Sequence, residues 1–143
     1  MQLSKFSDYS FRILIFAGTK NQLCTTSEVS KAFNISRHHL VKIIHRLEKL
    51  GFLKTKKGKN GGFQLNVDPS SIKIGKTLTI IEQNFDIVEC FSSDKDQCKI
   101  TSNCRLKHAL HAAMGKFIDE LNRYTLNDLL QPSNQLYRIL LSA

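Results

Sequence analysis

The chain has 143 residues and a mass of 16.3 kDa; 41% of its residues are hydrophobic and 23% are charged. This composition is typical of a globular protein with one domain, or one domain plus a dimerisation element, and it excludes a collagen-like or disordered chain. The longest uncharged apolar stretch of the N-terminal region, residues 13–17, is far shorter than the ~20 residues of a membrane span, and no signal-peptide pattern precedes it. We therefore expect a cytoplasmic protein with no membrane partner.

The formal net charge of +9 is confined to the first half of the chain. Residues 1–67 carry 12 Lys and Arg against 3 Asp and Glu, whereas residues 68–143 carry 9 of each. Between Ser36 and Lys59, eight basic residues stand beside a single acid, Glu48. Such a patch attracts a polyanion by its charge and by the release of counterions. Charge segregation of this kind favours a nucleic-acid partner over a merely solvated face.

Three helices are predicted in the basic half. Apolar residues at helical spacing mark the first, over residues 5–20. Thr25 and Glu28 form a capping-box pattern that starts a second, short helix. Ser36 is placed to cap a third helix, which we expect to end near Gly51. The second and third helices, separated by a tight turn, form a helix-turn-helix.

A β-hairpin is predicted to follow. Residues 52–55 and 63–67 have the pattern of strands, and the glycine-rich residues 56–62 between them tolerate the positive φ angles of a tight turn. Helix, helix-turn-helix and hairpin in this order indicate a winged helix-turn-helix. The predicted fold class is therefore mainly α with a small β-hairpin, completed by a long C-terminal dimerisation helix.

The second half is predicted to be helical on both sides of a polar loop. Helices are expected over residues 74–83 and 104–124, with the cysteine-containing residues 84–103 between them and a last helix starting at Thr125. The longer helix carries a narrow apolar seam suited to a partner helix, either the chain's own first helix or a second copy. The seam consists of Leu106, Leu110, Ala113, Phe117, Leu121 and Tyr124.

These elements divide the chain into three regions. Residues 1–67 are the predicted winged helix-turn-helix domain. Residues 68–103 are the connecting helix and a cluster-binding loop, and residues 104–143 are the dimerisation helix and the C-terminal helix.

Two basic surfaces are candidates for DNA contact. In a helix-turn-helix the second helix enters the major groove, so its outward side chains meet phosphates and base edges. On the third helix these are Arg37, His38, Lys42, His45 and Lys49. The hairpin tip would reach a neighbouring minor groove or the backbone through Lys56, Lys57, Lys59 and Asn60. Double-stranded RNA fits less well, because its major groove is too narrow for a helix.

A second candidate site is a cluster of three cysteines, Cys90, Cys98 and Cys104. Structural disulfides are uncommon in the cytoplasm, so clustered thiols indicate metal or redox chemistry. Cys104 is expected at a helix N-terminus, which lowers a thiol pKa. The spacing leaves three interpretations open: an iron–sulfur cluster, a structural zinc site completed by His108, and a thiol-redox site. Cys24, remote from the others, is expected to be structural.

No enzymatic motif is present. The sequence lacks a phosphate-binding glycine loop before a helix, a nucleophile elbow and an HExxH pattern, and Gly58, Gly61 and Gly62 lie in the predicted hairpin tip. The sequence therefore predicts a protein that is not an enzyme.

Four segments resemble the NsrR regulators, nitric-oxide-sensing iron–sulfur repressors of the winged-helix family that also contains IscR. They are Met1-Gln2-Leu3, Phe6-Ser7-Asp8-Tyr9, Lys57-Gly58-Lys59-Asn60-Gly61-Gly62 and Cys104-Arg105-Leu106-Lys107. The resemblance implies a homodimer that binds palindromic operator DNA and holds one cluster, [2Fe–2S] or [4Fe–4S], in each subunit. It also implies that nitric oxide attacks the cluster and releases the repressor from genes of nitrosative stress.

The same resemblance implies a set of ligands. Cys90, Cys98 and Cys104 occupy the positions of the cluster cysteines. IscR-like members have a histidine ligand three residues after the last cysteine, where this chain has Lys107. This departure favours the nitric-oxide sensors and makes Asp8, reaching across from the partner subunit, the candidate fourth ligand. The alternative is a winged-helix DNA-binding protein with a zinc or thiol-redox site and no nitric-oxide sensing.

Overall fold

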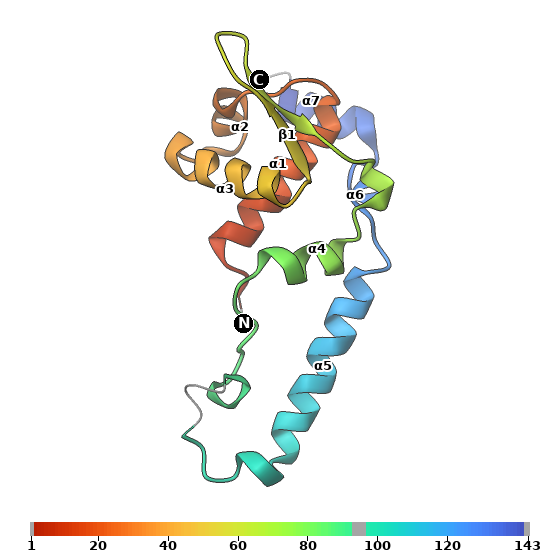
Figure 1. The fold of residues 1–143 in the computed structure, drawn as a ribbon. Coiled ribbons are helices and arrows are strands. Elements are labelled where there is room, and N and C mark those ends of the chain that lie inside the picture. The colour runs from red at the N-terminus through yellow and green to blue at the C-terminus, as the bar shows by residue number, and fades with distance from the viewer. Residues whose placement is uncertain (1, 93–96, 142–143) are drawn as a thin grey trace.

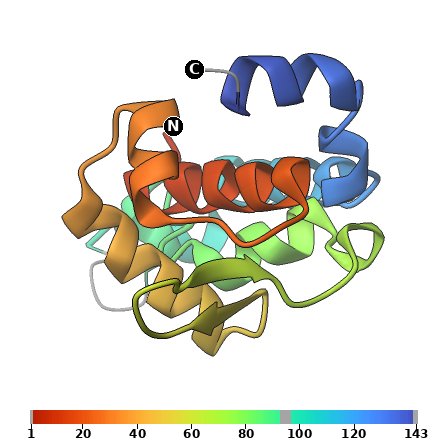
Figure 2. The same cartoon turned by 90° about the horizontal axis from the view of Figure 1, so that it is seen from above.

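The computed structural model describes residues 2–92 and 97–141, which form a helical body and a long arm that projects from it (Figure 1). Helix α1 (Lys5–Lys20) lies at the centre of the body, with α7 on one side of it and α3 and the hairpin on the other (Figure 2). Ser4 caps its start by accepting a hydrogen bond from the Ser7 backbone N–H at 3.1 Å. Its buried side chains, Ile13, Leu14, Phe16 and Ala17 among them, form the middle of the core.

The helix-turn-helix is formed by α2 (Thr26–Phe33) and α3 (Arg37–Lys49). The predicted capping box is confirmed, because Thr25 and Glu28 each bond to the backbone of the other. The Ser36 side chain caps α3 by accepting from the His39 N–H at 3.4 Å. The buried face of α3 consists of Leu40, Ile43, Ile44 and Leu47, and this packing fixes the opposite face toward solvent.

The predicted hairpin is confirmed as an antiparallel pair of β1 (Leu53–Lys56) and β2 (Gly62–Leu65). An isolated bridge joins β2 to the segment before α2, with Cys24 and Phe63 exchanging backbone hydrogen bonds of 2.7 and 2.8 Å. A Cβ at Gly62 would lie 2.3 Å from the Cys24 carbonyl oxygen, so this close approach requires glycine. The hairpin is thereby anchored, at the turn end of β2, to the segment that precedes α2.

The arm is built on α4 (Ile74–Ile81) and α5 (Arg105–Leu121). Gly75 allows the two helices to touch, since a Cβ there would meet the Ile118 carbonyl oxygen at 2.4 Å. The Asn122 side chain accepts a hydrogen bond from the Lys76 N–H at 2.7 Å. Short 3-10 turns, η1 (Pro69–Ser71), η2 (Glu89–Phe91) and η3 (Thr101–Asn103), occupy the connections. None of the described helices is long and apolar enough to cross a membrane.

The C-terminal region differs from the single helix predicted to start at Thr125. Thr125 does cap a helix, but α6 (Leu126–Leu129) ends after one turn and a separate helix, α7 (Ser133–Leu141), follows. Pro132 explains the break, because its ring excludes a helical bond and disfavours the α conformation in the residue before it. The break turns α7 back across α1 in the body. The fold class predicted from the sequence is confirmed by these elements.

Candidate nucleic-acid interface and metal centre

The outward face of α3 is basic. The structure places the five predicted side chains on the exposed side of the helix, opposite its buried stripe. These residues are Arg37, His38, Lys42, His45 and Lys49. Packing therefore presents hydrogen-bond donors along most of the exposed face of α3, beginning at its first turn.

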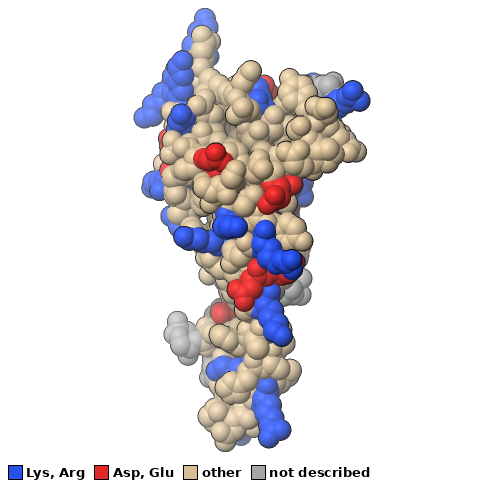
Figure 3. All heavy atoms as spheres, turned by 90° about the vertical axis from the view of Figure 1, so that its right-hand side faces the viewer, with Lys and Arg blue, Asp and Glu red and all other residues tan. Residues whose placement is uncertain are grey.

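The hairpin tip forms the second basic surface. Lys56, Lys57, Lys59 and Asn60 are all exposed there. The turn needs Gly58, whose φ is +104°, and closes with a hydrogen bond from the Gly61 N–H to the Gly58 carbonyl at 2.9 Å. The loop projects from the top of the molecule in Figure 1, and lysine and arginine side chains cover the projection at the top of Figure 3.

A side-chain hydrogen bond joins the two basic surfaces. The Thr55 hydroxyl of β1 donates to the Glu48 carboxylate of α3, so the one acid of this region is used to hold the hairpin against the helix. Between them lies a groove of about 240 Å³ whose lining includes Val41, His45 and Thr55. The sequence pattern does not predict this bond, because the two residues belong to different elements and pair only after folding.

The three cysteines of the second half lie around the arm's loop. Cys90 is in η2 and is half-buried, Cys98 is exposed, and Cys104 is the half-buried N-cap of α5. Residues 93–96, which lie between the first two, are outside the described residues. Among residues 2–92 and 97–141, the structure gathers no set of three or more His, Cys, Asp or Glu side chains that could hold a metal ion.

The chemistry of these donors nevertheless fits a thiolate-bound cluster. Cys90 and Cys104 are free thiols, and the Cys104 sulfur accepts a hydrogen bond from the Lys107 backbone N–H at 3.4 Å. Hydrogen bonds to the cysteine sulfurs are a recurring feature of iron–sulfur sites. The loop is also held to α5 by the Phe91 and His111 rings, whose centroids are 6.1 Å apart. Three sulfur donors on one anchored loop suit iron–sulfur chemistry.

Cys24 has no part in this group. It is fully buried beside Phe63, and burial raises the pKa of its thiol to about 12. The expectation that Cys24 is structural is therefore confirmed.

Asp8 lies in the first turn of α1 and is paired within its own chain. Arg12 donates to both carboxylate oxygens, at 3.0 and 2.8 Å, and its guanidinium also lies 5.5 Å from the centre of the Tyr9 ring. In Figure 1, α1 belongs to the body, whereas the cysteine loop lies at the far end of the arm. One chain therefore does not bring Asp8 to the cysteines.

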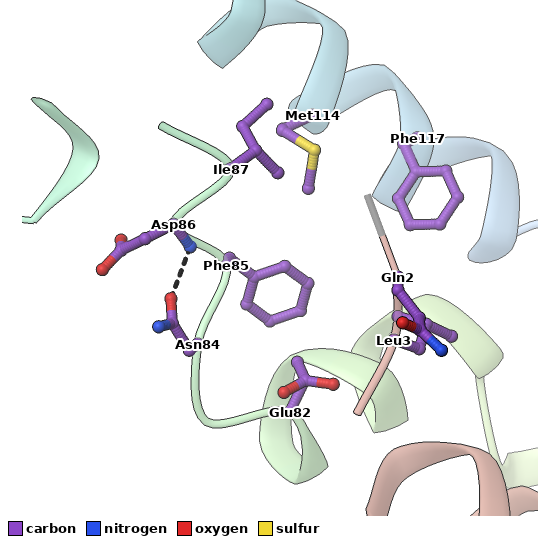
Figure 4. Close-up of a pocket in the computed structure, with 9 residues that line it drawn as sticks. All are labelled: Gln2, Leu3, Glu82, Asn84, Phe85, Asp86, Ile87, Met114 and Phe117. Atoms are coloured by element: carbon purple, nitrogen blue, oxygen red, sulfur yellow. Dashed lines mark hydrogen bonds between the residues drawn. The ribbon is translucent and has the colours of Figure 1, made fainter. Parts of the chain in front are cut away.

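The loop starts at a junction with the N-terminus of the chain. The Glu82 carboxylate accepts a hydrogen bond from the Ser4 backbone N–H at 3.0 Å. Burial favours the neutral form of Glu82, but hydrogen bonds from Ser4 and Ser7 outweigh it and hold its pKa below the usual range. Beside this contact is a cavity of about 300 Å³ (Figure 4). Its walls are Gln2, Leu3, Glu82, Asn84, Phe85, Asp86, Ile87, Met114 and Phe117.

Comparisons with known proteins agree with this arrangement. Residues 3–132 match the Rrf2 family model, described as an iron-dependent transcriptional regulator. The chain is 38% identical to the HTH-type transcriptional regulator NsrR of Bacillus licheniformis, over 98% of this chain and 99% of that protein. It is 40% identical to NsrR of Geobacillus kaustophilus, over 98% and 97%. The solved structure of T. potens IscR has the same fold, with a TM-score of 0.68 over 92% of this chain and 87% of that one at 21% identity.

Proposed function

Because this chain belongs to the Rrf2 family of iron-dependent transcriptional regulators, we propose that it is a nitric-oxide-sensitive repressor that binds operator DNA as a homodimer. Its relatives are named transcriptional regulators, so its role is DNA binding rather than catalysis. The observation that carries the proposal is the combination of an exposed basic α3 and hairpin tip with a three-cysteine loop on one chain.

The DNA is bound by two parts of the body. Helix α3 enters the major groove, where Arg37 and His38 at its N-terminal end meet base edges and phosphates. Lys42, His45 and Lys49 continue this contact along the helix, and Lys56, Lys57, Lys59 and Asn60 of the hairpin tip meet the backbone or the neighbouring minor groove. The Thr55–Glu48 hydrogen bond holds the hairpin in a fixed position relative to α3, so both can contact the DNA together.

A second copy of the chain pairs along α5. Leu106 on this helix is 64% exposed, and Ala109 and Ala113 on the same side are exposed as well. An exposed apolar strip on a surface helix is stabilised by burial against an identical strip. A two-fold axis there presents two copies of α3 to successive major grooves, about 34 Å apart.

The cysteine loop is the proposed sensing site. The cluster would be held by Cys90, Cys98 and Cys104. Asp8 of the partner subunit would provide the fourth ligand, and to do so its carboxylate would leave Arg12 and bind the cluster instead. When bound, a [2Fe–2S] or [4Fe–4S] cluster would supply iron that reacts with nitric oxide. The residues of the chain carry the rest of the response. Ordering of the loop fixes Glu82 against Ser4 and α4 against α5, and these contacts set the orientation of α1 and of the α3 helix packed on it.

The test uses protein purified without air. Iron and sulfide are measured together with the visible spectrum, and operator binding is then followed by fluorescence anisotropy during a nitric oxide titration. We expect coloured protein whose DNA affinity falls as the cluster absorbance is lost. A Cys104→Ser variant should lose the iron and bind DNA equally with and without the gas.

Two results would contradict the proposal. Operator binding that persists after the cluster absorbance has gone would remove the link between sensing and DNA. Colourless protein that contains zinc, with thiols that ignore nitric oxide, would favour a structural metal site instead.

A further inference from the structure

Val41 occupies an unusual place on the DNA-facing helix. Of the large apolar residues of α3, all of which the structure describes, Leu40, Ile43, Ile44 and Leu47 are between 0% and 7% exposed, whereas Val41 is 56% exposed. It therefore contributes little to the core. It lies one helical turn after Arg37 and one turn before His45, which places all three on the same line of the helix surface.

The surroundings of Val41 are those of a contact surface. It lies on the groove between α3 and the hairpin, with His45 of its own helix and Thr55 of β1 in the same lining. Cationic side chains border it along α3, and the lysines of the hairpin tip continue the positive surface beyond β1. An apolar side chain gains nothing from phosphates, so on a bound nucleic acid the favourable contact for Val41 is an apolar group.

The major groove offers one such partner. Each base pair presents donors and acceptors there, and thymine alone adds an apolar group, its C5-methyl. On the premise that the protein binds DNA through α3, as proposed above, we infer that Val41 reads a thymine by packing against this methyl group. Val41 is thus a specificity-determining residue, and the cationic residues around it hold the helix in register.

The position of the thymine follows from the helix. Arg37 and His45 flank Val41 by one turn on either side, so the contacted thymine lies between the base or phosphate positions that these two side chains meet. In a homodimer the contact occurs twice, at symmetric positions of the two half-sites.

The experiment separates the methyl group from every other feature of the base. The tightest duplex is first selected from a random-sequence library with the full-length protein. Each symmetric pair of thymines is then replaced by uracil, which lacks only the C5-methyl group. Affinities are measured for the wild-type protein, for Val41→Ala and for the matched control Val67→Ala, whose valine is 39% exposed but lies outside α3 and the hairpin.

We expect one pair of thymines at which uracil lowers wild-type affinity by about fourfold for each methyl group lost from a buried contact. Val41→Ala should bind the thymine and uracil duplexes equally, and Val67→Ala should behave as the wild type. Thermal unfolding should be unchanged in both variants, since both side chains are exposed.

Two outcomes would overturn the inference. If no thymine is sensitive to uracil, or if the sensitivity persists in Val41→Ala, Val41 does not read a methyl group, although DNA binding itself stands. If the library yields no preferred duplex, sequence-specific DNA binding fails and the role of Val41 fails with it.

Discussion

At the scale of single residues, the positions that the sequence predicts well are those with local causes. The Thr25 capping box and the Ser36 cap each depend on residues within one turn of the chain, and both are present. The Glu48–Thr55 bond, by contrast, joins side chains from different elements. Nothing in the spacing of these two residues indicates the pair, because it depends on how the hairpin packs against α3.

One residue-scale prediction concerns Cys24. Burial raises its thiol pKa to about 12, so at pH 8 Cys24 stays in the unreactive thiol form. In cluster-free protein treated with iodoacetamide, we expect the half-buried thiols of Cys90 and Cys104 to be alkylated while Cys24 remains unmodified. Peptide mass spectrometry measures this, and alkylation of Cys24 at a similar rate would show that it is not held in the core.

A second residue-scale prediction concerns Glu28. Burial raises its pKa, but hydrogen bonds from Lys20, at 2.5 Å, and from Thr25 outweigh burial and lower it overall. Because the pKa of Glu28 is lower in the folded than in the unfolded protein, its carboxylate stabilises the fold at pH values above the unfolded-state pKa. This stabilisation is lost as the pH falls through the folded-state pKa.

We therefore expect Glu28→Ala to reduce the free energy of unfolding by about 0.5–1 kcal/mol at pH 7, because it removes the ion pair with Lys20 and one half of the capping box, and by less in acid. Urea unfolding at pH 7 and at successively lower pH measures the change. Ser27→Ala, an exposed neighbour in the same turn, is the control. If the destabilisation by Glu28→Ala grew as the pH falls, the pKa of Glu28 would be raised in the folded protein, not lowered.

At the scale of elements, helices and strands are predicted by periodicity and by glycine positions, and their ends fall within a few residues of the expected ones. The helix expected over 104–124 is observed as Arg105–Leu121, and that expected over 74–83 as Ile74–Ile81. The exception is the C-terminal region, where Pro132 divides one expected helix into α6 and α7. The proline was visible in the sequence, but the return of α7 onto α1 depends on packing that no local pattern encodes.

The element-scale prediction concerns the crossing of α4 and α5. A Cβ at Gly75 would lie 2.4 Å from the Ile118 carbonyl oxygen and 2.7 Å from the Asn122 side-chain oxygen, so the helices must separate. We expect Gly75→Ala to lower the free energy of unfolding by about 1–3 kcal/mol, the usual cost of overpacking.

Gly115→Ala is the matched control in the same pair of helices. A Cβ at Gly115 meets nothing within 4 Å, and alanine favours the helix by up to about 1 kcal/mol. Urea unfolding of the two variants should therefore give shifts of opposite sign. Equal shifts would show that the helices do not touch at Gly75.

At the scale of the whole molecule, the sequence divides into a basic first half and a neutral second half. The structure shows which parts of the molecule each half forms. The basic residues 1–67 supply the helix-turn-helix and hairpin of the body, whereas the neutral second half supplies the arm and then returns to the body through α6 and α7. The described residues do not gather the three cysteines with Asp8, and the proposed meeting of these groups could not be derived from spacing. It would depend on a loop of more than ten residues and on the proposed contact with a second copy of the chain.

The whole-molecule prediction uses this charge separation. Each lysine–phosphate contact contributes about 0.9 to the slope of log affinity against log salt concentration, and a homodimer makes each contact twice. Lys57→Ala and Lys59→Ala should therefore each flatten the salt dependence of operator binding. Lys116→Ala, an exposed lysine on the arm, should leave the slope unchanged. Anisotropy titrations over a series of salt concentrations measure it, and an equal effect of Lys116→Ala would place DNA along the arm as well.

The base of the arm is fastened twice. Besides the Gly75 crossing, residues 72–74 pair with 124–126 through hydrogen bonds of 3.0 Å from the Ile74 N–H to the Tyr124 carbonyl and 2.9 Å from the Leu126 N–H to the Ile72 carbonyl. Helix α5, 17 residues long, spans about 26 Å at ~1.5 Å per residue and leads from this base to the cysteine loop. Because both sets of contacts hold the base, a displacement of the cysteine loop at the far end of α5 would be carried along a rigid helix to α4, which packs against α5 and α1.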